Sequence, residues 1–296
     1  MEITLPLKSL FVPKIKAMFL MLASSLFFAL MGALVKTAGN VPFIEKALFR
    51  NLVSLFLALF LVIYRKQNPW GKRGNRMLLL ARGVSGTIGM VLYFYGIDRL
   101  ILADSSMLNK MNPFFVTIFA VIILKERITR HQVASLILAL LGAALIIKPS
   151  FGFSQAGPAA VCFLSAVFAG LAYTFVSLLA GREDGPTIVF YFSLVSTLVC
   201  LPLSLIHFVV PTLTQLLLLI GAGVVAALGQ FSLTVAYRYA PASEVSIYNY
   251  SNVVFSSLLG IFLFSEVPDL ASLSGYCLIV GAGYIIYKFG SSRAAD

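Results

Sequence analysis

The chain has 296 residues, of which 60% are hydrophobic and only 11% charged, and its mean hydropathy is +0.97. A soluble domain carries about a quarter charged residues, and no water-soluble fold could cover this much apolar surface. Composition therefore excludes a soluble protein. The formal net charge of +11 lies mostly in short loops between apolar runs, which argues against a nucleic-acid-binding face.

Ten apolar runs are long enough to cross a bilayer, which takes about 20 residues. They are too long and too continuous for barrel strands, so each is predicted to be a helix. The first is also too long for a signal-peptide core and is predicted to be retained. In chain order the predicted spans are 17–38, 43–64, 77–97, 104–124, 131–148, 157–179, 187–207, 213–237, 242–264 and 270–288.

Lys and Arg residues are unevenly distributed between the two sides of the membrane. If the N-terminus is cytoplasmic, the basic loops 65–76 and 125–130 are cytoplasmic too, whereas only Arg99 and Lys148 lie clearly on the opposite side. The positive-inside rule then predicts a multi-pass protein of the bacterial cytoplasmic (inner) membrane with both termini in the cytoplasm. This arrangement requires an even number of crossings.

The second half repeats the first at an offset of 140 positions. The matched residues include these pairs: Ser25 and Ser165, Phe28 and Phe168, Gly83 and Gly223, Gly89 and Gly229, Asn109 and Asn249, Asn112 and Asn252, and Glu126 and Glu266. Each copy has five predicted helices, and an odd number inverts the second copy. The expected fold is therefore an all-α integral membrane protein whose ten transmembrane helices form two inverted five-helix repeats.

Polar residues interrupt the predicted helices 104–124 and 242–264 at matched places. Asn109 and Asn112 lie on one helix face, and Asn249 and Asn252 repeat that spacing. Burying an amide without a partner costs roughly 2–7 kcal/mol, so these side chains are expected to face one another, a water-filled cavity or a substrate. Hydrogen bonds that only join helices remain the alternative.

Lys110 lies between the first two asparagines, and its counterpart in the second copy is Tyr250. A lysine in hydrocarbon is costly, so Lys110 is expected either to line the cavity or to extend outward to the membrane surface. The loss of symmetry at this position suggests a substrate with one anionic end.

Two arginines and several tyrosines complete the predicted binding residues. Arg50 is expected to turn toward the cavity or another helix and to hold a carboxylate or phosphate, whereas Arg82 is close enough to a helix end to reach lipid phosphate. Tyr95 and Tyr248 are expected to wall the cavity, although most such rings serve as packing or interfacial anchors.

Four acidic residues stand at helix ends. Asp104 and Glu244 occupy matched positions at the starts of the fourth and ninth predicted helices, where the helix dipole favours carboxylates. They are also candidates for coupling transport to protons, because buried acids can have raised pKa values. Glu126 and Glu266 are interpreted as structural turn residues.

No cofactor, metal site or catalytic motif is predicted. The chain has no HExxH, GxSxG or Walker A pattern, and Cys162, Cys200 and Cys277 stand singly in apolar runs. The glycines from Gly83 to Gly96 follow no strand and are expected to allow close helix packing.

The segment NPFFVTIFAVIILKERIT (112–129), followed by LLGAALII, resembles the signature region of the EamA-type transporters of the drug/metabolite transporter superfamily. The second copy keeps SEVPD and IVGAGYII but has Val253 in place of Pro113, and FRNLVSLFLALFLVIYRK (49–66) looks like the family's second helix. The resemblance implies a small-solute transporter with a central cavity. It divides the chain into a cytoplasmic lead-in (1–16), two EamA-like five-helix repeats (17–148 and 157–288) and a cytoplasmic tail (289–296).

These observations predict a secondary active transporter, not an enzyme, that moves a small polar or amphiphilic metabolite, amino-acid-like or anionic, across the inner membrane by alternating access. The predicted partners are the substrate, the lipid bilayer and possible coupling protons, with no nucleic acid, in a monomer or homodimer. The alternatives are a lipid flippase and a non-transporting membrane scaffold or receptor. The predicted substrate contacts are Asn109, Lys110, Asn112, Tyr248, Asn249, Asn252, Arg50 and Tyr95.

Overall fold

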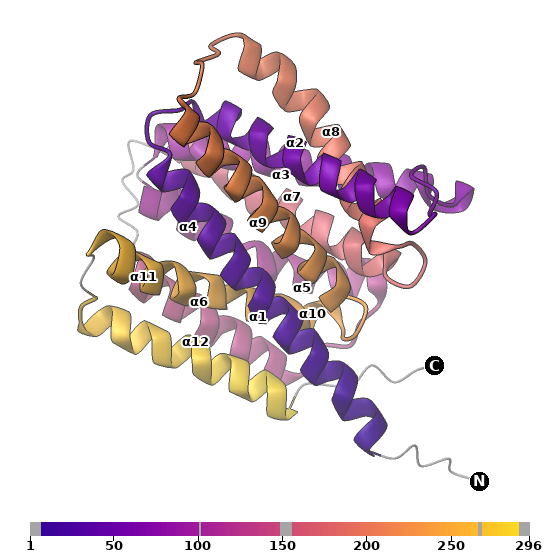
Figure 1. Ribbon diagram of the computed structural model, residues 1–296. Coiled ribbons are helices and arrows are strands. Elements are labelled where there is room, and N and C mark those ends of the chain that lie inside the picture. The colour runs from indigo at the N-terminus through magenta and orange to yellow at the C-terminus, as the bar shows by residue number, and fades with distance from the viewer. Residues whose placement is uncertain (1–6, 101, 149–155, 266–267, 290–296) are drawn as a thin grey trace.

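The computed structural model describes residues 7–100, 102–148, 156–265 and 268–289 (Figure 1). Over these residues the chain is helical, apart from turns and an isolated bridge between Ala180 and Glu183. Ten spans within them are long and apolar enough to cross a membrane. The prediction of an all-α membrane protein with ten crossings is confirmed.

The helices follow the predicted order closely. They are α1 (Leu7–Thr37), α2 (Phe43–Tyr64), η1 (Arg73–Asn75), α3 (Arg76–Arg99), α4 (Leu102–Asn109), α5 (Asn112–Leu124), α6 (Arg130–Ile147), α7 (Ala156–Leu179), α8 (Gly185–Leu205), α9 (Leu213–Ala236), α10 (Ala242–Val245), η3 (Ser246–Tyr250), α11 (Ser251–Phe264) and α12 (Leu270–Phe289). The first helix begins at Leu7, before the predicted residue 17, so part of the predicted lead-in is helical.

The prediction of one continuous fourth helix is wrong, because the chain breaks between α4 and α5 at Lys110 and Met111. Pro113 has no N–H and cannot donate to the carbonyl of Asn109 four residues earlier. The side-chain Nδ2 of Asn112 donates to that carbonyl instead, at 2.8 Å. The break therefore comes with its own replacement hydrogen bond, and it lies beside the polar residues of interest.

The ninth predicted helix is also interrupted, by the 3-10 segment η3 between α10 and α11. No proline causes this change. Serine hydroxyls at both ends donate to backbone carbonyls: Ser246 Oγ donates to Ser243 O at 3.4 Å, and Ser251 Oγ donates to Tyr248 O at 2.6 Å. Such local bonds compete with the regular helical ladder.

Each long helix packs chiefly against a helix of the other repeat. The main pairs are α1 with α9, α3 with α7, α2 with α8, and α6 with α12. Figure 1 shows α1 beside α9, and α6 beside α12. Glycines allow the closest approaches, as at Gly89 of α3, where an added Cβ would lie 3.0 Å from the backbone nitrogen of Ala169 in α7. The two repeats are interlocked through these crossings.

The helix ends repeat at the same offset as the sequence. Lys125 and Ser265, 140 positions apart, both end their helices in the left-handed conformation. Thr129 accepts a hydrogen bond from the backbone N–H of Gln132 at the start of α6, and Asp269 accepts one from Ser272 at the start of α12. Lys148 lies 2.6 Å from Asp269 and, with the N–H of Ser272, holds the pKa of that carboxyl below its usual range.

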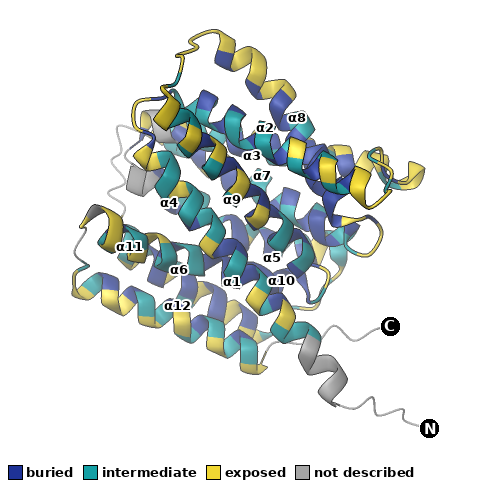
Figure 2. Ribbon diagram, viewed as in Figure 1, coloured by how far each residue is buried: buried dark blue, intermediate teal, exposed yellow. Residues whose placement is uncertain are grey.

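Buried residues gather where the helices cross, while exposed residues lie on outward faces such as that of α12 (Figure 2). Many of the exposed side chains are large and apolar: Phe56, Phe60, Leu198, Phe262 and Val280 are each more than half exposed. Exposed apolar surface on this scale is what a helix presents to lipid.

Candidate functional site

A polar cluster joins the two repeats at the break between α4 and α5. Lys110 donates from Nζ to Oδ1 of Asn252 in α11, at 2.6 Å. Asn252 in turn donates from Nδ2 to the backbone carbonyl of Ser25 in α1, at 2.9 Å. On the other side of the break, Asn109 donates from Nδ2 to Ser165 Oγ of α7, at 3.1 Å. Residues singled out in both halves of the sequence are thus brought into direct contact.

The cluster is built from matched pairs but is not symmetric. Asn109 is bonded to Ser165, whereas its counterpart Asn249 makes no side-chain hydrogen bond to any other described residue, although it is only 9% exposed. Lys110 has Tyr250 as its counterpart, and that tyrosine is fully buried with a hydroxyl that lacks a partner among the described residues. The asymmetry leaves the amide of Asn249 without a side-chain partner among the described residues, while the Lys110 ammonium is held by Asn252.

Asn112 lies at the same break, is only 4% exposed, and contacts the cluster through the Asn109 carbonyl described above. Its Oδ1 is buried and has no hydrogen-bond partner among the described residues. The side chain of Asn112 is therefore bonded to the nearby residue Asn109. This hydrogen bond stabilises the break between α4 and α5.

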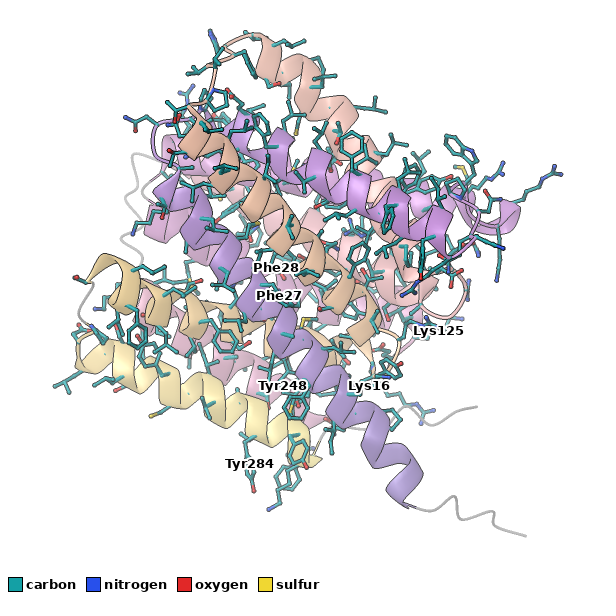
Figure 3. All side chains as sticks on the ribbon, in the orientation of Figure 1. Lys16, Phe27, Phe28, Lys125, Tyr248 and Tyr284 are labelled. Carbon is teal, nitrogen blue, oxygen red and sulfur yellow. The ribbon has the colours of Figure 1, made fainter. Side chains whose placement is uncertain are left out.

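The backbone of Tyr248 contacts the cluster, because its carbonyl accepts a hydrogen bond from Ser25 Oγ at 3.5 Å. The ring of Tyr95 is 39% exposed and has the guanidinium of Arg99 at 5.7 Å from its centroid. The ring of Tyr248 faces α12, where a Cβ added to Gly283 would lie 3.7 Å from it. Figure 3 shows Tyr248 near Tyr284, which belongs to α12. Neither the Tyr95 nor the Tyr248 hydroxyl is hydrogen-bonded to the cluster in the described part of the chain.

Acidic residues form a second polar network at the end of the bundle where α5 ends and α10 begins. Glu126 accepts hydrogen bonds from the backbone N–H groups of Ala242 and Ser243, at 2.8 and 3.2 Å, and from Ser243 Oγ at 2.7 Å. Glu126 therefore caps α10, which agrees with its interpretation as a structural turn residue. Its counterpart Glu266 lies outside the described residues.

Glu244 belongs to the same network and is 1% exposed. Gln132 donates to its Oε1 at 3.2 Å, and Lys14 Nζ lies 3.7 Å from its Oε2. Lys16 and Lys125 are at this end of the bundle as well (Figure 3). Gln132 of α6 was not predicted from the sequence, because the matched position of the second repeat holds Ser272 and not a glutamine. Asp104 lies in α4, but its side chain is outside the described part of the structure.

Arg82 is not at the lipid surface, contrary to the expectation that it could reach lipid phosphate. Its side chain is 2% exposed, and its guanidinium lies 4.3 Å from the centroid of the Phe192 ring in α8. Arg50 turns from α2 toward α3, with Nη1 3.8 Å from Met90 Sδ. That direction agrees with the expectation that Arg50 would seek another helix. The sequence does not show how deeply Arg82 lies within the bundle, and for this reason the expectation failed.

Comparison with known proteins identifies relatives over nearly the whole chain. The model of the EamA-like transporter family matches residues 15–148 and again residues 158–288. A pseudopaline exporter of Pseudomonas aeruginosa (strain UCBPP-PA14) is 41% identical over 261 residues, which cover 88% of this chain and 91% of that protein. An S-adenosylmethionine uptake transporter of Rickettsia bellii is 27% identical over 82% of this chain and 84% of that protein.

A solved crystal structure shares the fold, with a TM-score of 0.81 over 94% of this chain and 99% of its own length. The two sequences are only 15% identical, so this likeness bears on architecture alone.

Proposed function

The chain belongs to the EamA-like transporter family, and on that basis we propose that it is a secondary active transporter that exports a small amino-acid-like or anionic metabolite across the inner membrane by alternating access. The transporter role follows from the family. Export is favoured because a relative that is 41% identical is a pseudopaline exporter, whereas the uptake transporter is more distant.

The contact between Lys110 and Asn252 carries the proposal for the binding site. It places a partly buried ammonium between the two repeats, where inverted-repeat transporters bind substrate. In the proposed complex, an anionic group of the substrate replaces Asn252 as the partner of Lys110, and Asn249 supplies its unused amide. Asn109 and Asn112 support this arrangement by holding the break in α4 and α5.

The inverted repeats supply two mirror-related states for alternating access. Hydrogen bonds from Ala242, Ser243 and Gln132 to Glu126 and Glu244 close one end of the bundle. In the proposed cycle these contacts break when that end opens. Glu244 is the proposed proton-coupling residue, because protonation of its carboxylate would remove the attraction to Lys14. Its counterpart Asp104 remains the second candidate for this role.

The closed end is proposed to be cytoplasmic, because it carries Lys16, Lys125 and Arg238 and thus follows the positive-inside rule. In a variant without native cysteines, Arg238→Cys and Lys148→Cys place a thiol at exposed positions on opposite sides. A membrane-impermeant maleimide applied to intact cells is expected to label only the cysteine at position 148, and inverted vesicles to give the reverse. Labelling of position 238 in intact cells would refute the orientation.

Counterflow in proteoliposomes tests the function directly. Vesicles containing the purified protein and loaded with unlabelled pseudopaline are expected to accumulate labelled pseudopaline from outside, whereas protein-free vesicles do not. S-Adenosylmethionine is the second probe. If neither compound exchanges while the same vesicles scramble a labelled lipid, the protein is a flippase and the metabolite proposal fails.

A further inference from the structure

Two arginine side chains lie along the same part of α3 and have no acidic partner among the described residues. The guanidinium of Arg82 lies against Gly86, and Nη1 of Arg50 lies 3.8 Å from Sδ of Met90, about one helical turn further along α3. Neither forms an ion pair with a carboxylate of the described residues, and Arg82 is 2% exposed. Buried guanidinium groups normally have a carboxylate or phosphate partner, because an uncompensated buried charge is strongly destabilising.

Their hydrogen-bond donors are largely unused. Nε and Nη1 of Arg82 and Nε of Arg50 are buried and have no partner among the described residues. Nη1 of Arg50 has only the thioether sulfur of Met90, which is a weak acceptor. These nitrogens can donate several charge-assisted hydrogen bonds to one planar or tetrahedral anion.

Aromatic rings surround the two guanidinium groups. Tyr173 of α7 lies within electrostatic range of both arginines, and Tyr237 within that range of Arg82. The two phenol rings are 6.3 Å apart between centroids, and Phe192 stacks under Arg82. Gly86 makes room for the Arg82 side chain, since a Cβ there would collide with both the guanidinium and the Phe192 ring. Helices from both repeats thus contribute to one enclosed basic group.

The position of this group relates it to the Lys110 cluster. Tyr173 is eight residues beyond Ser165 on α7, which corresponds to roughly 12 Å along a helix. Tyr237 immediately precedes Arg238, at the end of the bundle proposed to be cytoplasmic. Arg82 lies near the start of α3, beside the 65–76 loop, and so stands between the Lys110 cluster and that end. Arg50 lies nearer the opposite end of α2, closer to the depth of Lys110.

We propose that Arg50 and Arg82 form an anion-binding site, framed by Tyr173, Tyr237 and Phe192, that receives a carboxylate or phosphate group of the transported molecule. The substrate is then a small acid, whose charged group passes from this site to Lys110. This inference rests on the proposed transport function and adds the chemical class of the substrate to it.

The test measures the thermal stability of the purified full-length protein in detergent with added succinate, inorganic phosphate or neutral succinamide at constant ionic strength. A ligand that binds only the folded protein raises its apparent melting temperature. Succinate or phosphate is expected to give a saturable rise, and succinamide none. Which anion acts decides between a carboxylate and a phosphate substrate.

Arg82→Gln is expected to weaken that anion's apparent affinity about ten-fold or more, while leaving the ligand-free melting temperature equal or higher, because an unpaired buried charge is removed. Arg65→Gln, at the exposed end of α2, is the matched control and should behave as the wild type. If Arg82→Gln does not fold, Arg50→Gln replaces it and is expected to show the same loss of anion affinity. An unchanged affinity in the Arg82 or Arg50 variant, or no rise with either anion in the wild type, overturns the site.

Counterflow separates this inference from the proposed function. If Arg82→Gln loses both the anion-dependent rise in melting temperature and pseudopaline exchange, the anion site and the transport function are both supported. Anion binding in a wild type that exchanges nothing leaves the site intact but refutes transport of pseudopaline. Unchanged exchange in Arg82→Gln, with anion binding lost, refutes the placement of the site on the transport route.

Discussion

Replacement of Lys110 by methionine is expected to lower the initial rate of substrate counterflow by roughly 10- to 100-fold. A hydrogen bond to a charged group is worth about 1.5–3 kcal/mol, and each 1.4 kcal/mol corresponds to a factor of ten. Methionine keeps the length and apolar stem of lysine but removes the ammonium that contacts Asn252. The measurement is the initial rate of counterflow in proteoliposomes at equal protein content, with whichever compound the wild type exchanges.

The control for this variant is Lys288→Met, which removes an exposed lysine near the end of α12. It should exchange substrate at the wild-type rate. Lys110→Met should also retain a wild-type or higher melting temperature, because the change removes a charge from the membrane interior. If Lys110→Met combined with Asn249→Ala exchanges substrate normally, the cluster is not the binding site.

Gly275→Ala in α12 is expected to destabilise the protein by about 1–3 kcal/mol, the usual cost of overpacking a close contact. A Cβ at Gly275 would lie 2.6 Å from the carbonyl oxygen of Gly142 in α6, and a Cβ at Gly142 would lie 2.7 Å from that of Gly275. Neither backbone can move aside without separating the two helices along their length. The measurement is the apparent melting temperature in detergent, together with the yield of folded protein.

Gly281→Ala provides a control on the same helix with the opposite expected sign. A Cβ at Gly281 meets nothing within 4 Å. Alanine is favoured over glycine inside a helix by about 1 kcal/mol, so this variant should be equally or more stable than the wild type. Equal melting temperatures for the two variants would show that α6 and α12 do not approach as closely as described.

Helix positions were largely predictable, because the constraint that makes each long apolar run helical is local to that run. The second span was predicted as 43–64, and α2 runs from Phe43 to Tyr64. A lipid environment requires every backbone group to be satisfied within the segment, and only a helix does this locally. The breaks at Lys110 and at Ser246–Tyr250 were missed, because they depend on side chains of Asn112, Ser246 and Ser251 that bond to nearby carbonyls.

The polar cluster around Lys110 was predictable as a set of residues but not as a set of contacts. Matched asparagines and Lys110 stood out because polar groups are costly inside a bilayer. Sequence reasoning left two orientations open for Lys110, and the structure directs it to Asn252. Arg82 was placed too near the lipid, because its distance from a helix end says nothing about which helices surround it.

The amino-acid sequence by itself determined the membrane location, the ten crossings and the duplication, because hydrophobic length and a fixed offset are properties of the chain read in order. Tertiary structure alone decided that Lys110 contacts Asn252, that Glu126 caps α10, and that Arg82 packs against Phe192 and Arg50 against Met90. The physical reason is that the long helices find their main partners in the other repeat. Side chains far apart in sequence become neighbours only when the two repeats interlock.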